Sequence, residues 1–147
     1  MGERKRTTGS FEAQRTTGSH DVLDRLFVYG TLRRGQTARS LIANSITRCM
    51  RASAIGRIYA FPMGYPGYNE GAGIVVGELL WLTDLAATFG LLDAYEGEDF
   101  ARILKQVTTE TGEELWTWIY TLADPEAIKL GTWIEDGDWV RYWTEQT

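Results

Sequence analysis

Cysteine and histidine are almost absent from this sequence. Cys49 is the only cysteine and His20 the only histidine among the 147 residues. One thiol provides no intrachain disulfide framework, no paired-cysteine redox motif and no thiolate zinc site, which favours a reducing, cytoplasmic setting. One histidine, in the N-terminal extension discussed below, leaves no Ser-His-Asp or Cys-His arrangement and no histidine-based metal site. We therefore expect acid–base chemistry from carboxylates, lysines or tyrosines, without a metal or other cofactor.

Long hydrophobic runs are also lacking. The most apolar stretch, AGIVVGELLWL, is interrupted by Gly77 and Glu78. No run approaches the roughly 18 residues that a membrane-spanning helix needs. The N terminus does not have the pattern of a signal peptide. We therefore expect neither secretion nor insertion into a membrane.

Acidic residues are missing from one part of the chain. Residues 25–69 carry seven arginines and no Asp or Glu, whereas residues 70–147 carry four Lys or Arg and sixteen Asp or Glu. Such asymmetry can indicate contact with nucleic acid. Because the arginines are scattered among apolar residues, we favour two oppositely charged halves that fold onto each other. No nucleic-acid partner is expected.

Residues 1–24 differ in composition from the rest of the chain. They contain few aliphatic residues and two copies of the pentamer RTTGS. Such a segment cannot bury a core, so we predict a disordered N-terminal extension. Residues 25–147 are sufficient for a single domain with one hydrophobic core.

Strand patterns dominate this domain. The predicted strands are residues 26–29, 52–61, 74–82, 103–109 and 115–122, and the predicted helices are residues 37–44 and 84–95. Thr83 is the expected N-cap of the second helix, Gly112 the turn between the last two strands, and residues 62–73 a Gly/Pro loop. Alternating aromatic and other residues in 115–122 indicate a strand covered on both faces. The prediction is an α+β fold: a small single domain with a curved, barrel-like, mostly antiparallel sheet and a few helices.

One carboxylate follows the apolar stripe of the second predicted helix. Leu85, Phe89 and Leu92 share one helical face, and counting four residues on from Leu92 reaches Glu96. Partial burial, the negative end of the helix dipole and neighbouring acidic residues should each raise the pKa of this carboxyl group. A raised pKa suits a general base. If instead the helix frays before Glu96, its side chain is simply solvated.

A turn follows the first predicted strand in the sequence VYGTLRRG. The strand ends at Gly30, where successive backbone N–H groups can point outward and form a small anion-binding concavity. Gly30 would also permit the close approach of a ligand. The turn lacks the second glycine and the lysine of a P-loop, so an ordinary strand-to-helix turn remains the alternative.

Several short motifs occur together in a characteristic order. They are VYGTLRRG at 28–35, GELLWL at 77–82, LLDAYEG at 91–97 with Arg102 after it, WIY at 118–120 and GDW at 137–139. With these motifs the chain resembles the gamma-glutamylcyclotransferase-like family, which includes gamma-glutamylamine cyclotransferases. The resemblance extends from Leu26 onward and implies a small α/β domain around a barrel-like sheet.

The resemblance also implies a reaction and a site. The substrate would be a small gamma-glutamyl amide, bound by Tyr29, Gly30, Thr31 and Leu32, with Glu96 as the proton acceptor. Its α-amine would attack its own γ-carbonyl and release 5-oxoproline together with an amine or amino acid. The alternative is a non-catalytic small-molecule or protein-binding module on the same fold.

The chain departs from the pattern of many relatives near both motifs. Ala38 and Arg39 stand where Asn or His is common, and Phe100 stands where Tyr is common. These departures bear on the identity of the substrate more than on the class of reaction.

Overall fold

A closed barrel with two helices beside it makes up the part of the chain that the computed structural model describes, residues 23–146. The strands are β1 (Arg25–Val28), β2 (Ile46–Phe61), β3 (Tyr65–Leu82), β4 (Phe100–Thr109), β5 (Glu114–Leu122) and β6 (Thr132–Trp133). The α-helices are α1 (Leu85–Glu96) and α2 (Trp139–Gln146), and short 3-10 turns span Arg39–Leu41, Ala43–Ser45, Gly97–Asp99 and Pro125–Leu130.

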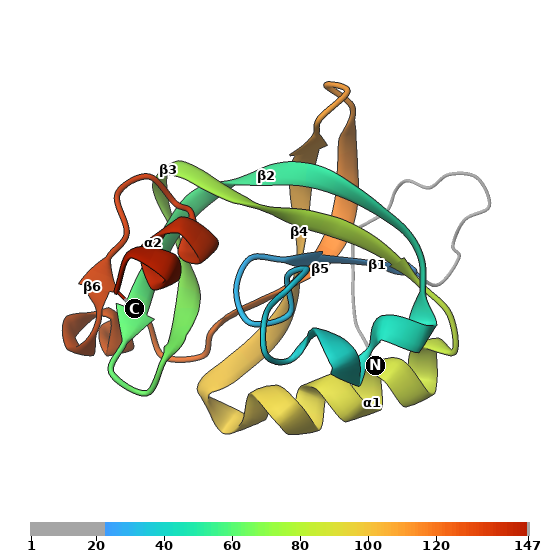
Figure 1. Ribbon diagram of the computed structural model, residues 1–147, viewed down its shortest axis with the longest axis horizontal. Helices are drawn as coiled ribbons and strands as arrows, with labels where there is room; N and C mark the ends of the chain where they lie inside the picture. The colour runs from blue at the N-terminus through green and yellow to red at the C-terminus, as the bar shows by residue number, and fades with distance from the viewer. Residues whose placement is uncertain (1–22, 147) are drawn as a thin grey trace.

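The barrel closes because β2 and β3 pair with each other as well as with other strands. The strand order is β3-β1-β5-β4-β2, the β3–β2 pairing completes the ring, and β6 adds to the far end of β2. All pairings are antiparallel except that of β1 with β5. Figure 1 shows β2 and β3 as one long curved hairpin, with α1 along one side and α2 near β6. The predicted α+β domain with a barrel-like, mostly antiparallel sheet is confirmed.

Two apolar clusters fill the structure. One includes Phe27, Tyr68 and Trp139 and lies within the barrel and toward α2. The other joins β1 and β3 to α1 through Phe89 and Leu92, which are 6% and 0% exposed. The predicted apolar stripe of α1 therefore packs against the barrel, and this packing fixes the direction of the helix end that carries the site.

The structure corrects the predicted boundary between the loop 62–73 and the strand that follows it. Residues 62–73 were expected to be a loop, yet only residues 62–64 turn, and β3 begins at Tyr65. Proline is tolerated because Pro66 is the second residue of the strand, where the backbone N–H is least needed. The glycines allow the irregular backbone farther along, where the β2–β3 register shifts between Ile55 and Arg57.

The prediction of a helix over residues 37–44 is wrong. Two separate 3-10 turns occupy this region, with backbone bonds such as Ile42 N–H to the carbonyl of Arg39 at 3.2 Å. Only Ala38 and Ile42 are buried here, whereas Leu41 is 39% exposed. One buried contact per turn cannot stabilise a regular short helix in water.

The predicted N-cap of α1 is also wrong. The hydroxyl of Thr83 donates to the carbonyl of Ser45 rather than accepting from a helical N–H, and Asp84 is the N-cap residue, with φ of 50° and no side-chain capping bond.

No helix or strand was predicted beyond Leu122, so the structure adds β6 and α2 to the predicted elements. None of the helices in residues 23–146 is long and apolar enough to cross a membrane. Residues 1–22 of the predicted extension lie outside the described part of the chain.

Candidate active site

The turn after β1 is closed by its own backbone. The N–H of Arg33 donates to the carbonyl of Gly30 at 3.0 Å, and the N–H of Ala38 donates to the carbonyl of Thr31 at 2.9 Å. The backbone N–H groups of Thr31 and Leu32 take part in neither bond. The concavity of outward N–H groups that the sequence suggests can therefore form at these two residues.

Gly30 is needed for packing of the turn against β3. A Cβ atom at this position would lie 2.5 Å from Cγ of Pro66. The space that a side chain would fill is occupied by the proline ring at the start of β3. Gly30 thus lets the turn pack directly on β3, which also lines the site.

The side chain of Tyr29 is part of the barrel core. Its hydroxyl donates to the carbonyl of Tyr120 at 2.7 Å and accepts from the N–H of Tyr68 at 3.1 Å. The residue is 6% exposed. Burial, with a smaller contribution from the charge of Glu96, raises the pKa of this phenol well above its usual value. Tyr29 therefore links three strands and places the turn that follows it.

Glu96 is the last residue of α1 and remains helical. Gly97 has a positive φ of 72°, which favours glycine, and donates its N–H to the carbonyl of Asp93, which ends the helix in an ordered way. Burial raises the pKa of the Glu96 carboxyl group to about 7, and the charge of Asp93 adds to this shift. Within residues 23–146, no side chain or backbone group forms a hydrogen bond or an ion pair with this carboxylate.

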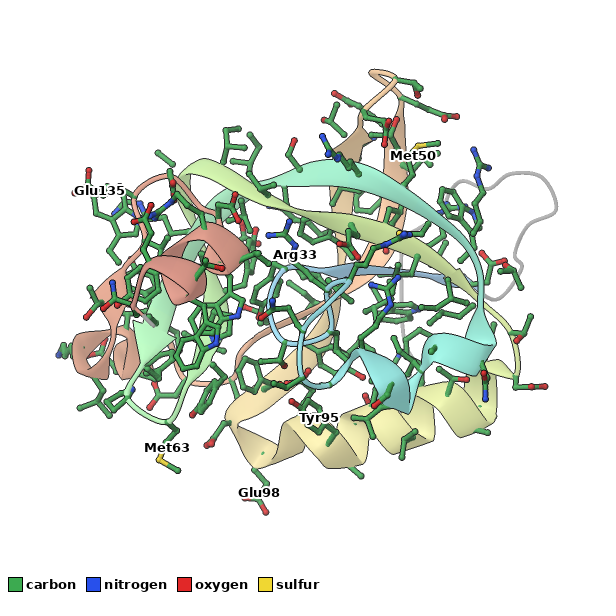
Figure 2. The ribbon with its side chains drawn as sticks, in the orientation of Figure 1. Arg33, Met50, Met63, Tyr95, Glu98 and Glu135 are labelled. Atoms are coloured by element: carbon green, nitrogen blue, oxygen red, sulfur yellow. The ribbon has the colours of Figure 1, made fainter. Side chains whose placement is uncertain are left out.

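The acidic neighbours of Glu96 do not contribute equally to its pKa. Asp93 is the acidic residue whose charge raises the pKa of Glu96. Figure 2 shows Glu98 projecting beyond the end of α1, away from the barrel. The solvent around Glu98 screens its charge, so its proximity in sequence has little electrostatic effect.

A cavity of about 290 Å³ brings the turn and the helix end together. All five residues predicted for the site line it: Tyr29, Gly30, Thr31, Leu32 and Glu96. The remaining wall includes Tyr65, Pro66, Tyr95, Asp99, Phe100 and Tyr120. A further contact joins the turn to α1, because the hydroxyl groups of Thr31 and Tyr95 are 3.0 Å apart and share a hydrogen bond.

A polar cluster supports the helix end beside this cavity. Arg102 donates to both oxygens of Asp93, from Nε at 3.0 Å and from Nη2 at 3.2 Å, and the hydroxyl of Tyr120 donates to Oδ1 of Asp93 at 2.6 Å. The guanidinium group of Arg102 also lies over the rings of Phe89 and Trp118. These bonds, those from Arg102 above all, lower the pKa of Asp93, so it stays ionised near Glu96.

Several residues of the site could not be predicted from the sequence. Tyr65 and Pro66 were missed because they fell in the predicted loop. Tyr95 and Tyr120 lay in recognised motifs but had no assigned role. Glu78 also supports the turn. The sequence indicated it only as an acidic residue two positions before Leu80, and therefore on the same buried face of the strand.

Known proteins resemble this chain in sequence. The family described as gamma-glutamyl cyclotransferase, AIG2-like, matches residues 26–141. A curated relative, the gamma-L-glutamyl-butirosin B gamma-glutamyl cyclotransferase of Niallia circulans, is 31% identical over 117 residues, covering 74% of this chain and 74% of the relative.

Solved structures show the same fold. YkqA from Bacillus subtilis superposes with a TM-score of 0.67 at 25% identity, over 85% of this chain and 42% of YkqA, so the chain spans less than half the length of that protein. An AIG2-like protein from Mus musculus gives a TM-score of 0.57 at 23% identity, over 74% of this chain and 84% of the mouse protein. The barrel with its few helices is therefore shared with these proteins.

Proposed function

This chain belongs to the gamma-glutamyl cyclotransferase, AIG2-like family, and on that premise we propose that it is a cytoplasmic enzyme that converts a gamma-glutamyl amide into 5-oxoproline. The observation that carries the proposal is the position of Glu96. A carboxylate with a pKa of about 7 lines the same small cavity as the turn of Gly30 to Leu32. This combination supplies a proton acceptor opposite a group of backbone donors.

The proposed reaction needs no nucleophile from the protein. The α-amine of the gamma-glutamyl group attacks its own γ-carbonyl carbon, a carbon–nitrogen bond closes the five-membered lactam, and the original amide bond breaks. Because both reacting groups belong to one molecule, the protein has mainly to hold them in an attacking geometry. Such orientation supplies up to roughly 7 to 11 kcal/mol of the barrier.

Glu96 would transfer the proton that this reaction requires. The substrate amine begins as an ammonium ion and must lose a proton before or during attack. The departing amine must gain a proton when the amide bond breaks. A carboxyl group with a pKa of about 7 both accepts and returns a proton near neutral pH.

The turn would bind the polar end of the substrate. The N–H groups of Thr31 and Leu32 suit either the substrate carboxylate or the negative charge that develops on the γ-carbonyl oxygen. The aromatic wall of Tyr65, Phe100 and Tyr120 would hold the intervening methylene groups. A cavity of about 290 Å³ is at the small end of ligand pockets, which favours a compact substrate.

Turnover of a substrate panel tests the proposal. The panel contains gamma-glutamyl amines, gamma-glutamyl amino acids, glutathione and gamma-L-glutamyl-butirosin B, and formation of 5-oxoproline is measured. We expect release of 5-oxoproline and amine in equal amounts from at least one compound. Thermal stabilisation by these compounds without turnover would instead identify a binding module on the same fold.

A further inference from the structure

A buried carboxylate lies behind the turn, on the side away from the cavity. Glu78 is in β3, and its side chain is 12% exposed. The backbone N–H of Arg34 donates to both of its oxygens, at 3.1 Å each, and Nη1 of Arg39 donates to Oε1 at 2.6 Å. Glu78 does not line the cavity. Its bonds are directed to the backbone that follows the site.

Arg39 and Arg33 extend this attachment to the neighbouring residues. Nη1 of Arg39 also donates to the carbonyl of Leu32 at 3.2 Å, so one guanidinium group joins Glu78 to the turn. Nη1 of Arg33 donates to Oδ1 of Asp138 at 3.0 Å, at the start of α2. Residues 32, 33 and 34 therefore each form a hydrogen bond to Arg39, Asp138 or Glu78. Figure 2 shows Arg33 in the interior between the turn and α2.

The direction of the remaining N–H groups follows from these bonds. The bond from Arg39 holds the peptide plane of the Leu32 carbonyl and the Arg33 N–H, and that N–H donates to the carbonyl of Gly30, which shares a peptide plane with the N–H of Thr31. The N–H groups of Thr31 and Leu32 belong to the same short stretch of backbone and take part in none of these bonds. The bonds to the Leu32 carbonyl and the Arg34 N–H thus fix the orientation of the Thr31 and Leu32 N–H groups.

We propose that Glu78, acting with Arg39, is a positioning residue that orients the Thr31 and Leu32 N–H groups toward the substrate. The inference rests on the proposed function. Stability alone would not require this arrangement, since well-packed apolar residues often replace a buried ion pair at no cost. What the ion pair adds is a set of directional bonds to the backbone at the site. The same bonds explain why Arg33 and Arg39 do not face the substrate.

Kinetics of the Glu78→Gln variant test the inference. We expect kcat/KM for the gamma-glutamyl substrate to fall roughly 10- to 100-fold, because bonds to a charged group are replaced by weaker ones. The pH midpoint of activity should stay near 7, because Glu96 is untouched. Glu70→Gln is the matched control: Glu70 is in the same strand and in an ion pair with Lys105, but its side chain is 60% exposed. Unchanged kcat/KM in Glu78→Gln, or an equal loss in both variants, would overturn the inference.

Amide hydrogen exchange of the unliganded protein provides a readout that does not depend on activity. In Glu78→Gln the N–H groups of Arg33 and Arg34, which are hydrogen-bonded in the wild type, should exchange at least tenfold faster, while β3 stays protected. Uniformly faster exchange throughout β3 would indicate a purely structural role and overturn the inference. If the wild type turns over no gamma-glutamyl compound, the proposed function fails, and the exchange pattern still decides whether Glu78 positions the turn.

Discussion

Asp93 precedes Glu96 by three residues on α1, and the negative charge of Asp93 raises the pKa of Glu96. Side chains three residues apart are neighbours on a helix. The hydrogen bonds from Arg102 and Tyr120 keep Asp93 ionised by lowering its own pKa. The polar cluster beside the cavity therefore acts on the protonation of Glu96 without contacting it. Burial is the larger cause of the shift, and the charge of Asp93 is the smaller one.

Replacing Asp93 should move the pH dependence of activity. In Asp93→Asn the nearby negative charge is lost and Arg102 is left without its partner, and both changes favour the ionised form of Glu96. The acid limb of kcat/KM, expected near pH 7 in the wild type, should shift to lower pH. Profiles measured between pH 5 and 9 check this. Glu98→Gln is the control, and it should leave the midpoint in place. An unmoved midpoint in Asp93→Asn would contradict the electrostatic link.

The same pKa shift predicts a pH-dependent stability difference. The pKa of Glu96 is raised from 4.5 to about 7 in the folded protein, so the native state binds more protons than the unfolded state between these values. The free energy of unfolding of the wild type therefore decreases as pH rises through this range, and the decrease is nearly complete above pH 7. Glu96→Gln should be more stable than the wild type at pH 8, by on the order of 2 to 3 kcal/mol, and nearly equal at pH 4. Urea unfolding at both pH values measures the difference, and a constant gap between the proteins would contradict it.

Packing of α1 against the barrel should depend on the apolar stripe. Leu92 is fully buried, whereas Leu91, the adjacent residue on the same helix, is 46% exposed. Leu92→Ala should lower the free energy of unfolding by about 2 to 5 kcal/mol, because it leaves a cavity between helix and barrel. Leu91→Ala should change it by less than about 1 kcal/mol. Similar losses in the two variants would show that the helix does not depend on this buried face.

The sequence predicted the fold well where hydrophobic periodicity was regular. The strands 26–29, 103–109 and 115–122 are short apolar or alternating runs, the stripe of α1 follows helical spacing, and all are present. The start of β3 was missed because Pro66 and several glycines are typical of loops, while here they allow close packing on Gly30 and a bent strand. Local composition could not show that β2, only three residues earlier in the chain, pairs with residues 65–69 and again from Ile74 onward.

The candidate site was predicted in part, for a related reason. Glu96 was found because its position on the helix can be counted from Leu92, and the turn was found because it follows a strand. Glu78 was not found, since its role depends on the backbone of Arg34 and the side chain of Arg39, which are brought together only by the closed barrel. Contacts between elements far apart in the chain leave little trace in the pattern of either element.

Removal of metal ions should not affect activity. The chain has one cysteine and one histidine, and the proposed reaction assigns proton transfer to a carboxylate and charge stabilisation to backbone donors. Exhaustive dialysis against EDTA should leave turnover unchanged. Loss of activity that a divalent cation restores would contradict the carboxylate-only mechanism.

Removal of the titrating proton from Glu96 is the most direct test of the mechanism. Glu96→Gln keeps the shape of the side chain, so substrate should still bind, but the amide cannot accept a proton at neutral pH. Release of 5-oxoproline should fall roughly 10² to 10⁴-fold, the usual contribution of general acid–base catalysis. Glu98→Gln removes the same charge two residues later, from a side chain that points away from the cavity, and should retain full activity. Equal losses in both variants would indicate a general effect of charge, and an active Glu96→Gln protein would exclude Glu96 as the proton acceptor.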